Sequence, residues 1–305
     1  MKQKITKKNR KRKKRSLKRS KMRGGEQTGA VFIDLHDESG LGNQLFIYAA
    51  GLAEKTKRDT ELYILPVKNN IHTKTDYRPL LFKQGIPVTI GSEIHQRSLK
   101  ANTLYNDVHL LYGATDKSLE HPNKDVILAR KFYQQYEHIA HVILQIRQDC
   151  VEYFEKTYPD QKSAISSSDT AFMHIRRGDY LGHGNETPIE YYKRALKKMD
   201  TDESIKYLYI LSDDLEWCKK EKWPTKKTIL GLDQENKDEL RVLYIMSLCL
   251  AGAIIAPSTF STWGAILGAD QNSASTIIYP LAWTANVYES GNGKRLKFPE
   301  RWNAL

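Results

Sequence analysis

After residue 169 the chain alternates short apolar runs with stretches in which apolar positions recur at helical spacing. Continuous apolar runs bounded by polar turns predict buried strands, and a recurrence every three or four residues predicts amphipathic helices. The predicted strands cover 170–175, 206–211, 227–231, 253–256 and 275–279. The predicted helices cover 188–199, 214–222, 236–250 and 260–269. Strands that alternate with helices in this way are typical of a parallel, doubly wound sheet.

The first half of the chain carries a shorter version of the same pattern. Residues 30–35 and 61–65 predict two strands, with an amphipathic helix over 44–57 between them. The polar stretch 66–125 is weakly periodic and predicts only loops and short elements. A helix is predicted over 137–158, because its apolar positions keep helical spacing.

These patterns divide the chain into three parts. Residues 159–169 are polar and include three consecutive serines, so we interpret them as a linker. We therefore predict a basic tail over 1–25, an N-terminal domain over 26–160 and a C-terminal domain over 161–305.

The positive charge of the chain lies almost entirely in the tail. Residues 1–23 contain 14 Lys or Arg and no Asp or Glu, whereas the whole chain has a formal net charge of +12. The remainder is nearly neutral, which argues against nucleic-acid binding by the globular part. The tail lacks hydrophobic periodicity and is predicted to be disordered. It fits a nuclear address, an arm that contacts polyanions, a patch for an acidic membrane surface, or a solvated extension without a specific partner.

Composition also bears on the compartment. No apolar segment follows the tail as in a secretory signal, and no apolar run approaches the roughly 18–20 residues that span a bilayer. Cys150, Cys218 and Cys249 are odd in number and widely spaced, which fits neither a disulfide framework nor paired zinc ligands. We expect a cytoplasmic protein without a transmembrane segment, whose tail alone is suited to direct it to a nucleus or a membrane surface.

Polar clusters follow three of the predicted strands where each strand ends. They contain His174, Arg176, Arg177 and Asp179 after 170–175, Asp213 and Asp214 after 206–211, and Ser258, Thr259, Phe260 and Ser261 after 253–256. The carboxyl ends of parallel strands meet at one edge of the sheet, so we expect these clusters to converge. Guanidinium groups, hydroxyls and helix N-terminal amides together suit an anionic ligand, most simply a diphosphate.

Each cluster also has a purely structural interpretation. The two arginines could close a surface turn, and Asp213, Ser258 or Thr259 could cap the helix that follows. The pair Asp213 and Asp214 raises the alternative of a metal site. Adjacent residues at a helix start point in different directions, however, and no third ligand is evident, so we expect no metal.

A further loop of interest precedes the first predicted helix. The turn Gly40-Leu41-Gly42-Asn43-Gln44 lacks the third glycine of a dinucleotide-binding fingerprint and the Lys-Ser/Thr of a P-loop. Its amides at Asn43 and Gln44 lie at a helix N-terminus and suit sugar hydroxyls or a diphosphate. We therefore expect this loop to line a cleft.

Several of these stretches resemble motifs of the α-1,2-fucosyltransferases of glycosyltransferase family eleven. Residues 40–49 resemble the opening LGNQ-x-F-x-YA motif, residues 132–135 resemble YFQS, and residues 174–180 match HxRRGDY. Residues 212–219 match SDD-x-x-WCK, and residues 258–265 resemble STFSWWGA. The matches keep the family's order between residues 40 and 265.

The resemblance implies an α/β fold of GT-B type, in which two Rossmann-like domains face each other across a cleft. The N-terminal domain, 26–160, would be the acceptor side, and the C-terminal domain, 161–305, would bind the nucleotide sugar. It implies inverting transfer of L-fucose from GDP-fucose to a glycan hydroxyl, with no cofactor and no required metal. Arg176 would hold the β-phosphate of GDP, while His174 and Arg177 shape the same pocket. Asp179 would act as the general base or would orient the arginines.

The chain also departs from the family pattern. Pro257 stands where members often have Asn, and Thr262 replaces the first tryptophan of the last motif. Val242 stands where members often have an aspartate that reads guanine. Glu239 precedes it by three positions on the same predicted helical face, so we hypothesise that Glu239 takes over guanine recognition. The alternative is a solvated acid favoured by the helix dipole.

Two further functions stay open at this point. The missing aspartate leaves a related transferase that uses another nucleotide deoxysugar. The basic tail leaves an inactive homologue that binds polyanions, although the intact Arg-Arg motif argues against it. No Golgi membrane anchor is visible, which favours a bacterial or viral type of enzyme.

Overall fold

The structure is a computed structural model. It describes residues 29–37, 39–67, 75–104, 123–130, 132–165, 167–183, 186–233, 237–281 and 297–305. The predicted basic tail, residues 1–25, lies outside these ranges.

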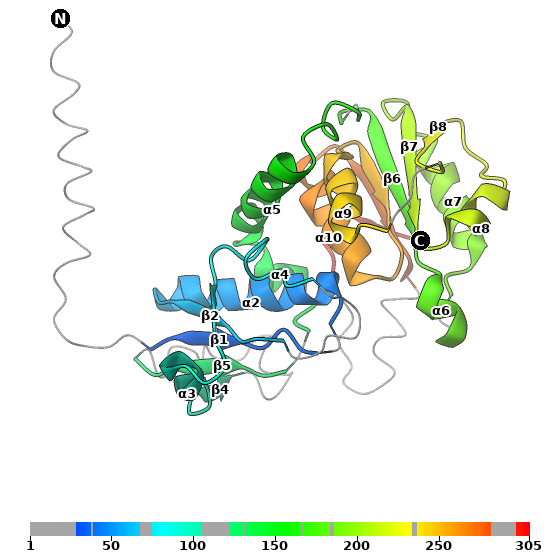
Figure 1. The fold of residues 1–305 in the computed structure, drawn as a ribbon. Coiled ribbons are helices and arrows are strands. Elements are labelled where there is room, and N and C mark those ends of the chain that lie inside the picture. The colour runs from blue at the N-terminus through cyan, green and yellow to red at the C-terminus, as the bar shows by residue number, and fades with distance from the viewer. Residues whose placement is uncertain are drawn as a thin grey trace, which may run out of the picture.

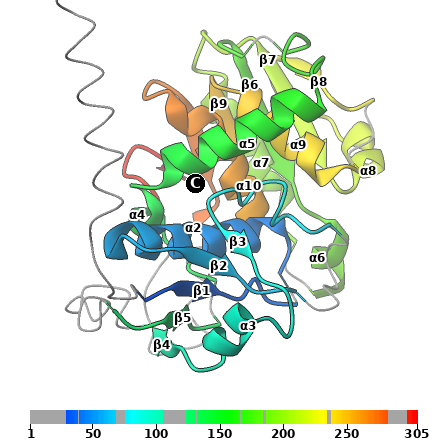
Figure 2. The ribbon, with the colours of Figure 1, turned by 60° about the vertical axis from the view of Figure 1, so that its left-hand side comes forward.

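The first part of the chain forms a five-stranded parallel sheet. The strand order is β3-β2-β1-β5-β4. The strands are β1 (Val31–Ile33), β2 (Leu62–Ile64), β3 (Ile86–Pro87), β4 (Asn102–Leu104) and β5 (Val126–Leu128). Helix α2 (Leu41–Arg58) packs along β1 and β2, and the short helix α3 (Glu93–Ser98) lies beside β4 (Figures 1 and 2).

The second part forms a six-stranded parallel sheet. Its order is β11-β10-β9-β6-β7-β8. The strands are β6 (Thr170–Ile175), β7 (Tyr207–Ser212), β8 (Thr228–Leu230), β9 (Gly252–Ile254), β10 (Thr276–Tyr279) and β11 (Asn303–Ala304). Helices α9 (Glu239–Leu248) and α10 (Thr259–Leu267) lie on one side of it, and α7 (Ile189–Met199) and α8 (Leu215–Lys220) lie on the other (Figures 1 and 2).

Burial on both faces explains why the second half reads so clearly as strands. In β6, Ala171, Met173 and Ile175 pack in the core on the α7 side, whereas Phe172 belongs to the core that contains α9 and α10. Both sets of side chains are fully buried. A strand covered on both faces is a continuous apolar run, which is the pattern seen in the sequence.

The two halves meet where the first turns of α2 and α10 pack together. A Cβ atom at Gly42 would lie 2.3 Å from the backbone nitrogen of Phe260, so this contact requires glycine. One turn further along, the rings of Phe46 and Trp263 have centroids 5.1 Å apart. The close approach brings the loops of both sheets to one place.

Some predicted elements differ from those observed. The helix predicted over 137–158 is two helices, α4 (Tyr136–Ile139) and α5 (Ile143–Thr157). A short helix, α6 (Gly178–His183), begins where the sequence pattern indicated only a break after β6. The spacing of apolar residues indicates which side chains are buried. It does not predict the break between α4 and α5 or the short helix α6, because these depend on contacts with segments distant in the sequence.

The predicted fold class is confirmed. Two α/β units with parallel sheets share one cavity between them, which is the GT-B arrangement of two Rossmann-like units facing across a cleft. The boundary at residue 160 stays a prediction, since α5 before it packs against α9 and α10. The three cysteines are free and buried.

Candidate active site

A cavity of about 520 Å³ opens between the two sheets. Its N-terminal wall is the first turn of α2 and the loop after β5, and its C-terminal wall is formed by the ends of β6, β7 and β9 with the first turns of α9 and α10. In the second sheet β6 lies between β7 and β9, so the strand order reverses there. Ligands of open parallel sheets bind outside the carboxyl ends of the strands at such a point.

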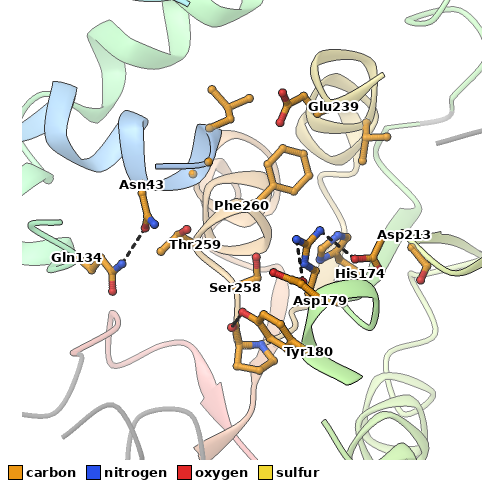
Figure 3. A pocket seen from close by; sticks show the side chains of 17 residues that line it. Asn43, Gln134, His174, Asp179, Tyr180, Asp213, Glu239, Ser258, Thr259 and Phe260 are labelled. Carbon is orange, nitrogen blue, oxygen red and sulfur yellow. Dashed lines mark hydrogen bonds and ion pairs between the residues drawn. The ribbon is translucent and has the colours of Figure 1, made fainter. Parts of the chain in front are cut away.

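Arg176 lies at the carboxyl end of β6 and lines the cavity. Its guanidinium makes two ion pairs, 2.9 Å to Asp179 of α6 and 2.9 Å to Asp213 after β7 (Figure 3). A guanidinium carries five N–H donors, so these two contacts leave donors for a ligand. The two carboxylates therefore fix the direction of a cation that remains 36% exposed.

Arg177 does not line the cavity, contrary to the sequence-based expectation for the donor pocket. Its guanidinium pairs with Glu186 and with Asp214 at 3.2 Å, and its central carbon lies 3.9 Å from the ring centroid of Trp217. Adjacent residues at the end of a strand point to opposite faces, which separates Arg177 from Arg176. Arg177 thus braces the loop against α8 while Arg176 faces the cavity.

His174 is buried at the base of the cavity. Burial lowers its pKa from 6.5 to about 4, partly offset by the nearby carboxylate of Asp213, while the Arg176 cation lowers it further. Its Nδ1 atom has no hydrogen-bond partner among the described residues, and its ring lies 5.7 Å from that of Phe260. The imidazole is therefore neutral at physiological pH.

The third polar cluster, residues 258–261, lies at the start of α10. Ser258, the N-cap residue, lines the cavity together with Thr259 and Phe260, and its side chain makes no capping hydrogen bond. Ser261 points elsewhere, because its hydroxyl accepts a hydrogen bond of 3.1 Å from the backbone of Ala256. Ser261 is thus a structural residue, whereas the first turn of α10 presents backbone amides and hydroxyls to the cavity.

The cleft loop is divided in a similar way. Gly42 and Asn43 line the cavity, but Gln44 is buried and its amide donates to the carbonyl of Ser39 at 2.9 Å. Gln134, from the loop after β5, donates a 2.8 Å hydrogen bond to the side-chain oxygen of Asn43 (Figure 3). The second amide at the cavity is therefore Gln134 and not Gln44.

Glu239 lines the cavity at the first turn of α9, and so does Val242 one turn later. Tyr77, which is fully buried, donates a hydrogen bond to the carboxylate of Glu239. Nothing in the weakly patterned stretch 66–125 pointed to Tyr77. Gln134, by contrast, lies within the matched residues 132–135.

Asp213 pairs with the guanidinium of Arg176, and Asp214 pairs with the guanidinium of Arg177. Asp214 caps α8 by accepting from the backbone of Trp217 at 3.1 Å, while Asp213 accepts from the backbone of Arg177 at 2.9 Å. Among the described residues, no three His, Cys, Asp or Glu side chains are grouped so as to hold a metal ion. Nor is any described helix both long and apolar enough to cross a membrane.

Comparison with known proteins identifies relatives among glycosyltransferases. The Escherichia coli protein O-antigen biosynthesis glycosyltransferase WbnK is 25% identical over 166 residues, which is 52% of this chain and 52% of WbnK. The chain thus spans about half the length of WbnK. Alpha-1,2-colitosyltransferase of Escherichia coli is 24% identical over 253 residues, which is 75% of this chain and 84% of that protein.

The solved structures that align with the chain include the fucosyltransferase NodZ. NodZ from Bradyrhizobium aligns with a TM-score of 0.46 and 13% identity, over 78% of this chain and 92% of NodZ. FUT1 of Arabidopsis thaliana in complex with GDP aligns with a TM-score of 0.44 and 15% identity, over 84% of this chain and 72% of FUT1.

The family model described as Glycosyl transferase family 11 matches residues 20–305. This range includes every residue of the cavity and both sheets. The chain therefore belongs to glycosyl transferase family 11, and the predicted enzyme class, a glycosyltransferase, is confirmed.

Proposed function

We propose that this protein transfers L-fucose, with inversion, from GDP-fucose to a hydroxyl of a galactoside in an α-1,2 linkage. The observation that carries the proposal is Arg176, a partly exposed cation held by two carboxylates in a cavity shared by both sheets. The start of α10 lies in the same wall, and helix N-termini favour bound phosphate. A cation and amides around one diphosphate are what a nucleotide-sugar donor requires.

In this proposal the donor diphosphate lies between Arg176 and the first turn of α10. The acceptor hydroxyl attacks C1 of the sugar, the bond from C1 to the phosphate oxygen breaks, and GDP departs with that electron pair, while the proton of the hydroxyl passes to solvent. Negative charge grows on the departing diphosphate, so a fixed cation stabilises the transition state more than the ground state. Arg176 supplies this charge, and no metal is required.

Asp179 then orients Arg176. Its carboxylate lies 2.9 Å from that guanidinium in an ion pair. The hydroxyl of Tyr180, the next residue, donates to the carbonyl of Pro257 at 2.8 Å and so ties α6 to the loop before α10. This contact supports a structural role for Tyr180, the last residue of the motif at 174–180.

A second donor is favoured by one observation. The relative with the longer alignment is named Alpha-1,2-colitosyltransferase, and colitose is a deoxysugar that lacks the 3-hydroxyl of L-fucose. A site that hydrogen-bonds a sugar hydroxyl rejects the analogue without it by a factor of about 10⁴–10⁵. The ratio of kcat/KM for the two GDP-linked sugars therefore distinguishes the two proposals.

The experiment is a donor screen by thermal shift, followed by product analysis. We expect GDP and GDP-fucose to raise the melting temperature, and UDP- and ADP-linked sugars to leave it unchanged. Formation of an α-1,2-fucosylated galactoside from GDP-fucose completes the test. A protein that binds heparin but none of the nucleotide sugars would instead be an inactive, polyanion-binding homologue.

We also propose a cytoplasmic location, with nucleotide sugar and glycan as the partners of the globular part. The buried, unpaired cysteines support a reducing compartment. The basic tail is proposed to contact polyanions or an acidic membrane surface through its charge alone.

A further inference from the structure

The hydrogen bond between Gln134 and Asn43 has a direction that leaves one end of the Asn43 amide for a ligand. The side-chain nitrogen of Gln134 donates to the side-chain oxygen of Asn43 at 2.8 Å, and both residues line the cavity (Figure 3). A primary amide has a donor end, its NH2 group, and an acceptor end, its carbonyl oxygen. Because Gln134 occupies the oxygen of Asn43, the NH2 group of Asn43 remains. Among the described residues this NH2 group has no hydrogen-bond partner.

Asn43 lies beside the first turn of α10. It belongs to the first turn of α2, and the two turns touch at Gly42, where a Cβ atom would lie 2.3 Å from the backbone nitrogen of Phe260. Thr259, at the start of α10, lies next to the Asn43 side chain in Figure 3. The NH2 group of Asn43 therefore adds to the backbone N–H donors of α10, where the diphosphate of the proposed donor lies.

The orientation of this amide decides whether it attracts or repels a diphosphate. With its NH2 group towards the phosphate oxygens, Asn43 donates a hydrogen bond to them. In the flipped orientation its carbonyl oxygen faces those oxygens, and two acceptors then meet. The two ends of an amide have nearly the same shape, so packing does not distinguish them and the hydrogen-bond partner does.

Gln134 is itself held by the residues on both sides of it. Tyr133 has φ 52°, and its hydroxyl donates to the carbonyl of Ala129 at 2.6 Å. A residue other than glycine keeps such a φ only where its surroundings fix it. On the other side, the hydroxyl of Tyr136 donates to the carboxylate of Asp270 at 2.7 Å. The loop is thus preorganised, and Gln134 presents its NH2 group to Asn43 before any ligand binds.

We propose that Gln134 is a positioning residue, which fixes Asn43 with its NH2 group towards the donor diphosphate. Asn43 then donates to the diphosphate from the N-terminal half, while Arg176 binds it from the C-terminal half. Charge grows on the departing diphosphate, so a donor fixed in advance stabilises the transition state more than the ground state. The inference rests on the proposed function, because it adds a residue to the proposed donor site.

The test compares Gln134→Glu with Gln134→Met. Glutamate has the shape of glutamine but only accepts, so Asn43 flips to donate to it and turns its own oxygen to the diphosphate. Methionine leaves Asn43 unrestrained, and the loss is about twofold, because either orientation is then open to the amide. For Gln134→Glu we expect kcat and the affinity for GDP to fall at least about tenfold, with the KM for the acceptor unchanged. Equal losses in the two variants overturn the inference, since a residue that only fills space loses as much with either.

The introduced glutamate also repels the diphosphate through its own charge. The same two substitutions in an Asn43→Ala protein keep that charge and remove the amide that flips. We expect the difference in GDP affinity between the Glu and Met variants to be at least about fivefold smaller in that background. Gln148→Glu, at an exposed position of α5, is the control for the added charge and should leave GDP binding unchanged. The same difference in both backgrounds overturns the inference.

Inorganic pyrophosphate separates this inference from the proposed function, because it carries the diphosphate without guanosine or sugar. Its affinity, measured by calorimetry, should decrease from the original protein to Gln134→Met and further to Gln134→Glu. If this order holds while GDP and GDP-fucose fail to bind, the proposed donor is wrong and the inference stands. Equal pyrophosphate affinity in the three proteins, or no binding to any of them, overturns the inference whichever donor the enzyme uses.

Discussion

The hydroxyl of Tyr77 donates a hydrogen bond to the carboxylate of Glu239, and this contact joins the two halves of the chain beside the cavity. Glu239 begins α9, whereas Tyr77 lies between β2 and β3 of the other sheet. We hypothesise that this carboxylate accepts from the N1 and N2 donors of guanine. The contact supports the hypothesis that Glu239 replaces the aspartate missing at Val242.

Glu239→Gln should weaken GDP binding by about 1–3 kcal/mol, because the variant loses a charge-assisted hydrogen bond. Tyr77→Phe should weaken it by a smaller amount, since only the orientation of the carboxylate is lost. Isothermal calorimetry with GDP measures both. Glu216→Gln is the control, because Glu216 also lies in the first turn of a helix but is exposed on α8. Unchanged affinity in Glu239→Gln would leave Glu239 as a first-turn acid favoured by the helix dipole.

Arg176→Ala should lower turnover at least about a hundredfold, since losing one preorganised group that stabilises charge in the transition state costs about 10²–10³ in kcat. The fold should be retained, because Arg176 is at the surface of the cavity. Arg97→Ala is the matched control: Arg97 pairs with Asp125 at 2.6 Å with similar exposure, at the amino edge of the first sheet. Near-normal turnover in a folded Arg176→Ala protein would exclude this role of Arg176.

Excess chelator should leave the transfer rate unchanged. Arg176 provides the positive charge, and the carboxylates of Asp213 and Asp214 are each engaged with a different arginine. The measurement is the initial rate after dialysis against EDTA, with and without added Mg²⁺ or Mn²⁺. Loss of activity that Mg²⁺ or Mn²⁺ restores would make Asp213 a candidate ligand.

His174 should make the folded protein less stable in acid. Its pKa is about 4 when folded and near 6.5 when unfolded, so between these values the unfolded chain binds a proton that the folded chain does not. The free energy of unfolding is therefore unaffected by the titration of His174 above pH 6.5. As the pH falls from 6.5 towards 4, this free energy decreases by about 1.4 kcal/mol per pH unit. Urea unfolding at several pH values measures this dependence, and the free energy of unfolding should fall less steeply with decreasing pH in His174→Gln than in the original protein. The same pH dependence in both proteins would contradict the lowered pKa of His174.

Removal of the basic tail should not affect catalysis on a small acceptor. A chain that begins at Glu26 lacks all 14 basic residues of 1–23 but keeps every residue of the cavity. It should lose binding to heparin or to anionic vesicles, and in the full chain that binding should weaken steeply with salt. A large fall in kcat after truncation would show that the tail contributes to the reaction.

Much of the second sheet could be predicted because its signal is local. The strand at 170–175 has the bounds predicted from the sequence, and Arg176 follows it at the edge where ligands bind. The first sheet was less predictable, since its edge strands β3 and β4 have only two and three residues. An element of that length has no periodicity of its own and forms only because a neighbouring strand is present.

The sequence by itself determined the alternation of strands and helices, the family motifs and the edge at which Arg176 lies. Only the tertiary structure separated Arg176 from Arg177, turned Gln44 inward, and brought Tyr77 and Gln134 to the cavity. Periodicity reports whether a side chain is buried, and a motif reports which chemical groups are available. Neither reports the partner that a side chain meets, because that partner is selected by packing between segments far apart in the chain.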